Sequence, residues 1–299
     1  MTEQYPDILG YEVIRLLGKG GFGEVYLCKK DGQEYAIKRI MGMLGNTEFD
    51  DFIREIRNLY IVSLVPHTVK YIDSFTIVQG VVIRIFAPIL RGEDVYKSTE
   101  YNSIPEELQD VETADNYIVT SYARGGNIED YYLPRDNAIN IVREIIETVL
   151  SYHSCGFVHK DIKGQNVLYD ENAQDFTIID FGAGNILKES HQDKGKTSEY
   201  IAPEEVETFI PQYSRTSFIK MKYEDYDYRK RDSYSTGVML FKIFNKVSPF
   251  TGDSKTYESK LNPIKSNSGN STLDTMIDLL IMPSQEDRIN LEQALELLG

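Results

Sequence analysis

The sequence has 299 residues, 41% hydrophobic and 26% charged, which is typical of a globular chain with one large or two ordinary domains and excludes wholesale disorder. Its 32 basic and 47 acidic residues give a net charge of −15, which argues against nucleic acid or an anionic membrane as a partner. No apolar run approaches the roughly 18 residues that a membrane span needs, and the first ten residues do not resemble a secretory signal. We therefore expect an intracellular, cytoplasmic protein without membrane insertion.

The sequence contains two cysteines, Cys28 and Cys155. Two are too few for a disulfide framework, and they lack the clustered spacing of a zinc site. We interpret both as small, buried hydrophobic residues.

The first ninety residues alternate strand-like stretches, at 11–17, 24–29 and 34–40, with turn signals. This pattern predicts an antiparallel meander. One helix interrupts it: Thr47 is a candidate N-cap, and apolar residues recur at three- and four-residue spacing over 49–59.

Beyond residue 134 the period becomes helical, with a long amphipathic helix at 138–150 and further helical patterns at 233–245, 272–282 and 290–298. A second, mostly helical lobe is therefore expected, and the fold class is α+β. Two stretches resemble insertions. Residues 93–115 carry eight acidic side chains against one basic one, and residues 208–228 are polar and rich in tyrosine. Both are expected to be surface loops, and the acidic one is a candidate site for a regulatory partner.

Gly18, Gly20 and Gly23 form a Gly-x-Gly-x-x-Gly motif, in which backbone N–H groups can approach phosphate oxygens. Alone, the motif also fits a plain hairpin. A dinucleotide site would need a helix after the third glycine, whereas a strand is predicted here. Lys38 lies in an apolar strand and, if buried, must find an anion, either Glu55 or nucleotide phosphates. By itself it would equally fit a surface lysine on an edge strand.

Further motifs follow in order: His-x-Asp-x-Lys-x-x-Asn at 159–166, Asp-Phe-Gly at 180–182 and Ala-Pro-Glu at 202–204. With these motifs the sequence from Tyr11 to Leu298 resembles the eukaryotic-type protein kinases, and in particular serine/threonine protein kinases. The resemblance implies a bilobal fold with a small antiparallel-sheet N-lobe with one key helix, at about 11–119, a hinge at about 120–126 and a larger, mainly helical C-lobe at about 127–298.

The resemblance also implies an ATP-dependent phosphoryl transfer, whose loose and highly charged transition state calls for positioning and charge neutralisation. Asp161 would accept the proton of the substrate hydroxyl or orient that hydroxyl. Lys163 would neutralise the γ-phosphate.

The metal and phosphate ligands follow from the same resemblance. Asn166 and Asp180 would supply hard oxygen ligands to Mg²⁺. Lys38 would hold the α- and β-phosphates, and Glu55 would fix the rotamer of Lys38, so that rotation of the helix bearing Glu55 could switch activity.

Nucleotide contacts are implied along the glycine motif, the apolar strands and the hinge. The residues are Gly18, Lys19, Gly20, Gly21, Phe22, Gly23, Val25, Ala36, Lys38, Thr120, Tyr122, Ala123 and Leu168. Thr120 would guard the back pocket, and backbone groups of 122–123 would meet adenine. Val25, Ala36 and Leu168 would sandwich the ring, although each also fits a core position without nucleotide contact.

Several motif residues resemble structural elements of the family. His159 and Phe181 are expected to pack and to take no part in proton transfer. Asp232 resembles the buried carboxylate that braces the catalytic loop, and Glu204 and Arg288 resemble a buried ion pair.

Some positions depart from the family pattern or bear on specificity. Lys160 replaces an arginine and lacks its planar fork, which argues against control by activation-loop phosphorylation. Asn127 and Gln165 stand where arginine-directed members carry acids, so a preference for basic substrates is not supported there. Lys163 and Thr197 favour serine or threonine over tyrosine as the acceptor.

Three functions remain open. The first is an active protein kinase that uses ATP and Mg²⁺ on protein substrates. It is favoured because all the expected catalytic, phosphate-binding and metal-binding residues are present: Lys38, Glu55, Asp161, Asn166 and Asp180. The second is a catalytically weak pseudokinase that acts as a nucleotide-binding scaffold. The third is a kinase of small molecules. Residues 202–204, Asp232 and Arg288 argue against it, because in the family that the sequence resembles they build a platform for extended peptides.

Overall fold

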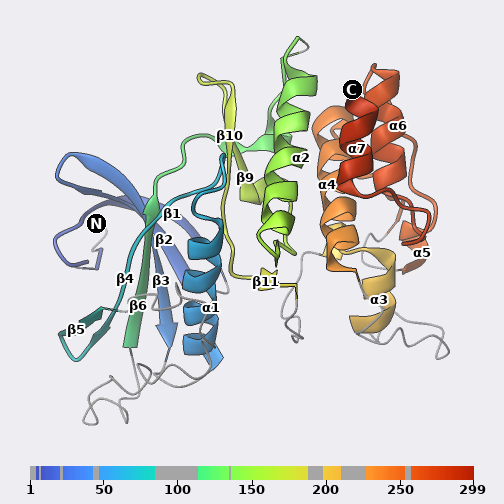
Figure 1. Ribbon diagram of the computed structural model, residues 1–299. Coiled ribbons are helices and arrows are strands. Elements are labelled where there is room, and N and C mark those ends of the chain that lie inside the picture. The colour runs from blue at the N-terminus through green and yellow to red at the C-terminus, as the bar shows by residue number, and fades with distance from the viewer. Residues whose placement is uncertain are drawn as a thin grey trace. The chain divides into compact units, whose positions relative to one another are not determined.

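The computed structural model describes residues 5–6, 8–20, 23–42, 47–84, 114–134, 136–187, 198–209, 227–252 and 257–299. The chain divides into two compact units, residues 1–64 with 68–123, and residues 65–67 with 124–299. Most of their helices and strands are labelled in Figure 1. Most of both predicted insertions, residues 93–113 and 210–226, lies outside the described residues.

The first unit contains a six-stranded antiparallel sheet. Its strands are β1 (Glu12–Gly20), β2 (Gly23–Lys30), β3 (Gln33–Gly42), β4 (Tyr71–Val78), β5 (Val81–Arg84) and β6 (Ala114–Ser121). The order in space is β1-β2-β3-β6-β4-β5. The predicted antiparallel meander is confirmed for β1 to β3, whereas β6 lies between β3 and β4 and breaks the sequential order. Residues 116–119 of β6 are buried, and such a strand gains from pairing at both edges, here with β3 and β4.

Helix α1 (Thr47–Val62) packs against β3 and β4 of this sheet. Its buried apolar residues recur every three or four positions, as predicted; they are Phe49, Phe52, Ile56, Leu59 and Val62. Glu55 lies on the same side of the helix and is only 6% exposed. A buried carboxylate that stays ionised is costly unless it has a partner such as a cation.

The second unit is mostly helical (Figure 1). Its helices are α2 (Ala138–Ser154), α3 (Pro203–Phe209), α4 (Tyr228–Asn245), α5 (Tyr257–Lys260), α6 (Ser271–Leu280) and α7 (Leu291–Leu298). Helix α4 packs against α2 and α6, and α7 also packs against α2 and α6. Helix α4 begins five residues earlier than the predicted 233–245, because the side chain of Asp227 caps it by accepting a hydrogen bond from Arg229 N.

Short elements connect these helices. The strands are β7 (Gly126–Asn127), β8 (Phe157–Val158), β9 (Val167–Asp170), β10 (Asp175–Ile178) and β11 (Asn185–Ile186), and the 3₁₀ turns are η5 (Ile128–Asp130), η6 (Gly164–Asn166) and η7 (Ser198–Tyr200). Strands β10, β9 and β7 form one small sheet, and β11 pairs with β8. The predicted α+β class, with an antiparallel sheet followed by a helical region, is confirmed. Within the described residues, no helix combines the length and hydrophobicity that crossing a membrane requires.

The two cysteines lie in different surroundings. Cys28 has no exposed surface, and burial raises the pKa of its thiol to about 11, which makes it unreactive. Cys155 caps the C-terminal end of α2 and is exposed, so its interpretation as a buried residue is wrong. The apolar face of α2 runs from Ala138 to Tyr152 and ends before Cys155.

Candidate functional site

An ion pair joins strand β3 and helix α1 within the first unit. Lys38 Nζ lies 2.8 Å from Oε1 and 2.7 Å from Oε2 of Glu55. The two side chains are 16% and 9% exposed, so the attraction between them acts with little screening by water. Lys38 is thus a partly buried ammonium with a matching carboxylate, and not a surface lysine on an edge strand.

The glycine motif occupies the hairpin between β1 and β2. Gly20 pairs with Gly23 and Gly18 with Val25 across the two strands, while Gly21 and Phe22 lie outside the described residues. A Cβ atom at Gly23 would lie 2.1 Å from Arg39 O, and its φ is +126°, so only glycine fits here. Lys19 Nζ extends from the hairpin to Glu24 Oε1, 2.8 Å away.

The residues expected around adenine are distributed over both units. Thr120 Oγ1 on β6 donates to Ala36 O on β3 at 3.3 Å, and residues 122–123 follow β6 and are half-buried. Val25 belongs to β2 of the same sheet. Leu168 belongs to β9 of the second unit.

In the second unit, two side chains converge on the carboxylate of Asp161. Lys163 Nζ lies 2.6 Å from Asp161 Oδ2, and Asn166 Nδ2 donates to the same oxygen at 3.0 Å and to Asp161 O at 2.8 Å. The carboxylate is therefore held in one orientation by a cation and an amide. Because Asn166 uses its nitrogen in this way, and no donor among the described residues engages its Oδ1, that oxygen is available to a cation.

Asp180 lies next to Asn166 in the fold. Ile179 N donates to Asn166 O at 2.9 Å, which ties the residue before Asp180 to the candidate catalytic loop, residues 159–166. Asp180 has a left-handed backbone, with φ at +62°, a conformation uncommon for a non-glycine residue. The carboxylate of Asp180 and the side-chain oxygen Oδ1 of Asn166 are hard oxygen donors, which suit Mg²⁺. The described residues contain no group of three or more His, Cys, Asp or Glu side chains that could hold a metal, so any ion here would need further oxygens from a ligand.

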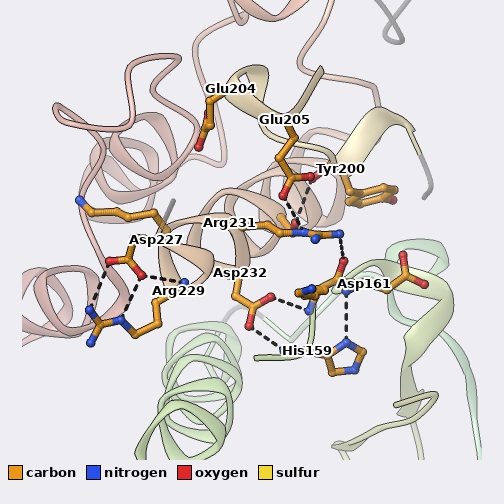
Figure 2. A network of polar contacts seen from close by, with 12 residues as sticks. His159, Asp161, Tyr200, Glu204, Glu205, Asp227, Arg229, Arg231 and Asp232 are labelled. Atoms are coloured by element: carbon orange, nitrogen blue, oxygen red, sulfur yellow. Dashed lines mark hydrogen bonds and ion pairs between the residues drawn. The ribbon is translucent and has the colours of Figure 1, made fainter. Parts of the chain in front are cut away.

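The backbone of the candidate catalytic loop is held by Asp232 near the start of α4 (Figure 2). Asp232 accepts hydrogen bonds from His159 N at 2.9 Å and Lys160 N at 2.8 Å, and lies 3.0 Å from His153 Nε2. Burial alone would raise the pKa of Asp232, but the contact with His153 and the bonds from the backbone lower it below its usual value, so the group is ionised. The predicted bracing role of Asp232 is confirmed.

His159 is fully buried, and its ring lies 5.0 Å from that of Phe181. Its Nδ1 accepts a hydrogen bond from Asp161 N at 3.3 Å, so the proton of the neutral ring is on Nε2, which has no partner among the described residues. Burial lowers the pKa of His159, which keeps the imidazole neutral. The prediction that His159 and Phe181 pack is confirmed.

Two buried ion pairs secure the segment after residue 200. The predicted pair is present, with Arg288 Nη1 and Nη2 lying 2.7 and 3.0 Å from the carboxylate oxygens of Glu204. Sequence reasoning missed the second pair, in which Arg231 Nε lies 3.0 Å from Glu205 Oε1 and Arg231 Nη2 donates to Lys160 O (Figure 2). The sequence did offer one signal for this pair. Glu205 directly follows Glu204 and Arg231 directly precedes Asp232, so both residues neighbour positions already expected to be buried and charged.

The protein kinase domain family matches residues 11–297 of the chain. Among curated relatives, eIF-2-alpha kinase GCN2 of Arabidopsis thaliana is 28% identical over 79% of this chain and 20% of its own length. Serine/threonine-protein kinase 17A of Oryctolagus cuniculus is 27% identical over 99% of this chain and 67% of its own. Serine/threonine-protein kinase pim-2 of Danio rerio is 28% identical, over 96% and 83%. The chain thus spans one fifth of the length of the plant relative.

Proposed function

Because the chain belongs to the protein kinase domain family, we propose that it transfers the γ-phosphoryl group of Mg-ATP to serine or threonine hydroxyls of protein substrates. The observation that carries this proposal is the convergence of Lys163 and Asn166 on the carboxylate of Asp161. A carboxylate fixed in this way can orient an acceptor hydroxyl and take up its proton as the new phosphate ester bond forms.

Charge neutralisation supports the same reaction. Lys163, beside Asp161, carries the positive charge that would face the γ-phosphate. Asn166 and Asp180 would hold Mg²⁺, which when bound neutralises phosphate charge. The Oδ1 of Asn166, which no donor among the described residues engages, and the bond from Ile179 N to Asn166 O support this assignment.

The residues proposed to bind the nucleotide belong mainly to the first unit, and Leu168 belongs to the second. Lys38 would bind the α- and β-phosphates, with Glu55 fixing its position, as their ion pair suggests. The backbone of residues 18–23 would cover the phosphates, and residues 120–123 would meet adenine. The partial exposure of Lys38, at 16%, supports this role because its ammonium remains accessible to an anion.

The choice of serine or threonine rests on two observations. Lys163 lies two residues after Asp161 and contacts its carboxylate directly, which supports a short aliphatic hydroxyl as the acceptor. Two of the relatives are named as serine/threonine-protein kinases. Thr197, the other residue expected to favour this acceptor, lies outside the described residues.

The test is transfer of radiolabelled phosphate from ATP to a mixture of proteins, with the Asp161→Asn variant as the matched control for contaminating kinases. We expect label on protein with the unmodified chain, a large loss with the variant, and phosphoserine or phosphothreonine as the product. Dominant phosphotyrosine would refute the acceptor assignment. Nucleotide binding without transfer would favour the pseudokinase alternative.

A further inference from the structure

Apart from the motif residues, one cluster of charged side chains joins three segments of the second unit. Lys242 Nζ on α4 lies 3.0 Å from Glu129 Oε2 in η5 and 3.0 Å from Glu199 Oε2 in η7. It also donates to the hydroxyl of Tyr200 at 2.7 Å, and this hydroxyl donates to Glu129 Oε1. One lysine therefore links two carboxylates and a phenol that come from distant parts of the sequence.

The same carboxylate reaches the catalytic loop. Gly164 N donates to Glu129 Oε1 at 3.1 Å. A Cβ atom at Gly164 would lie 2.2 Å from Asn127 Oδ1 and 2.5 Å from Glu129 Cδ, so a larger residue would displace this carboxylate. Glycine at 164 supplies both the N–H donor and the space for the acceptor.

The segment at 199–200 is held through its backbone as well. Lys260 Nζ on α5 donates to Glu199 O at 2.8 Å, and Ser235 Oγ on α4 donates to Tyr200 O at 2.9 Å. Burial alone would lower the pKa of Lys242, but Glu129 and Glu199 raise it above its usual value, so the lysine is charged. The side chains of Glu129 and Lys242 are 8% and 20% exposed, which limits screening of their attraction.

We propose that Glu129 and Lys242 are positioning residues for the phosphoryl acceptor, because they fix the 199–200 segment against the catalytic loop at Gly164. This inference rests on the proposed function. Gly164 directly follows Lys163, which holds the Asp161 carboxylate, so a shift of Gly164 changes where that carboxylate meets the acceptor hydroxyl. Lys38 and Glu55, proposed to hold the nucleotide phosphates, belong to the other unit and are not part of the cluster.

The kinetic test separates acceptor from nucleotide. For Lys242→Met, Glu129→Gln and the milder Tyr200→Phe, we expect kcat/KM for an acceptor peptide to fall about 10- to 100-fold, as misplaced reacting groups do. The KM for ATP should stay within about twofold of the unmodified protein, since ATP binding does not use the cluster. Lys265→Met is the matched control, because it removes an exposed lysine 3.3 Å from Asp278 in the same unit.

The pair should also act as a unit. Once either partner is lost, the other no longer fixes the segment. The kcat/KM of the double variant Glu129→Gln/Lys242→Met for the acceptor peptide should therefore lie within about threefold of that of the less active single variant. Thermal melting identifies any variant that fails to fold. Tyr200→Phe removes one hydroxyl and keeps the ring, so it supplies a folded variant for the comparison.

A second readout needs no activity. With ¹⁵N-glycine and ¹³C-carbonyl lysine labels, only glycines that follow a lysine, at 20, 164 and 195, give a coupled amide signal. The Gly164 signal should shift in Glu129→Gln and Lys242→Met and stay unchanged in Lys265→Met.

The outcomes distinguish the two proposals. If the unmodified protein transfers no phosphate, the proposed function fails, and this inference fails with it, even where the Gly164 signal shifts. If the unmodified protein is active but the variants match it, or lose ATP and acceptor kinetics equally, only the positioning role is overturned.

Discussion

Glu204 and Arg288, which lie 84 residues apart in sequence, form a two-bond ion pair that is shielded from solvent. The Arg288 guanidinium also lies 4.7 Å from the centre of the Tyr234 ring and donates through Nε to Met282 O at 3.0 Å. The pair thus connects the first turn of α3 to the loop between α6 and α7. Loss of either residue would leave the charge of the other buried without its partner.

Arg288→Ala should therefore lower the free energy of unfolding by about 3–5 kcal/mol, the usual cost of breaking a buried pair from one side. Urea denaturation followed by circular dichroism measures this change. Arg229→Ala is the control, because Arg229 is 54% exposed and its pair with Asp227 should contribute at most about 1 kcal/mol. Equal effects of the two substitutions would contradict the structural role of Arg288.

Asp161→Asn and Asp180→Ala should affect the reaction in different ways. The first keeps the shape of the side chain but removes the proton acceptor, so turnover should fall about 10²- to 10⁴-fold while Mg-ATP affinity persists. The second removes a proposed metal ligand, so both turnover and Mg-ATP affinity should fall. Calorimetric titration with Mg-ATP separates the two, and loss of nucleotide affinity in Asp161→Asn would argue against its assignment to the acceptor.

Activity should not depend on phosphorylation of the activation loop. Lys160 is 3% exposed, and its ammonium lies 4.3 Å from the centre of the Tyr228 ring. The Asn185 amide satisfies its neighbours when its oxygen faces Lys160 Nζ, 3.1 Å away. Internal contacts thus hold a side chain that would otherwise bind a phosphate. The loop residues 188–197, including Ser190 and Thr197, lie outside the described residues.

Phosphatase treatment of the purified protein, checked by mass spectrometry, tests this expectation. The rate should change less than about tenfold, which corresponds to less than about 1.4 kcal/mol of transition-state stabilisation. A hundredfold loss would show that a phosphate is required.

Lys260 should make stability depend on pH in the alkaline range. It is fully buried, and burial lowers its pKa to about 7, although Glu199 and Glu205 oppose the shift. An unfolded lysine titrates near about 10.4. Below pH 7 both states carry the proton, whereas between about pH 7 and 10 only the unfolded state does, so the contribution of Lys260 to stability rises with pH.

Lys260→Met removes this titration. The free energy of unfolding of the unmodified protein should therefore increase relative to that of the variant as the pH is raised from 7 to about 10. Urea denaturation of both proteins at several pH values gives the difference. Parallel stability curves would show that Lys260 does not titrate in this range.

Local patterns in the sequence were enough to find the helices and the motif residues. Periodic apolar residues located α1, α2 and α7, and the order of short motifs singled out Asp161, Asn166 and Asp180. These features depend on neighbours within a few residues, which a single sequence displays directly.

Long-range pairing was not predictable in the same way. The insertion of β6 between β3 and β4 depends on which strand edges meet, and no local pattern encodes that choice. The contact between Glu129 and Lys242 brings together a 3₁₀ turn and the far end of α4, and each residue alone is typical of a solvated surface. Cys155 was misassigned because its position depends on where α2 ends.

Ile8 lies before the first residue of the family match, which begins at Tyr11, yet it has no exposed surface. It belongs to the same core cluster as Cys28, Phe75 and Tyr117. A fragment cut at the family boundary would lose this side chain and uncover apolar surface on the sheet, at a cost of about 2–5 kcal/mol for a buried isoleucine. We therefore expect a fragment that begins upstream of the family match and keeps Ile8 to be more stable than one that begins at Tyr11.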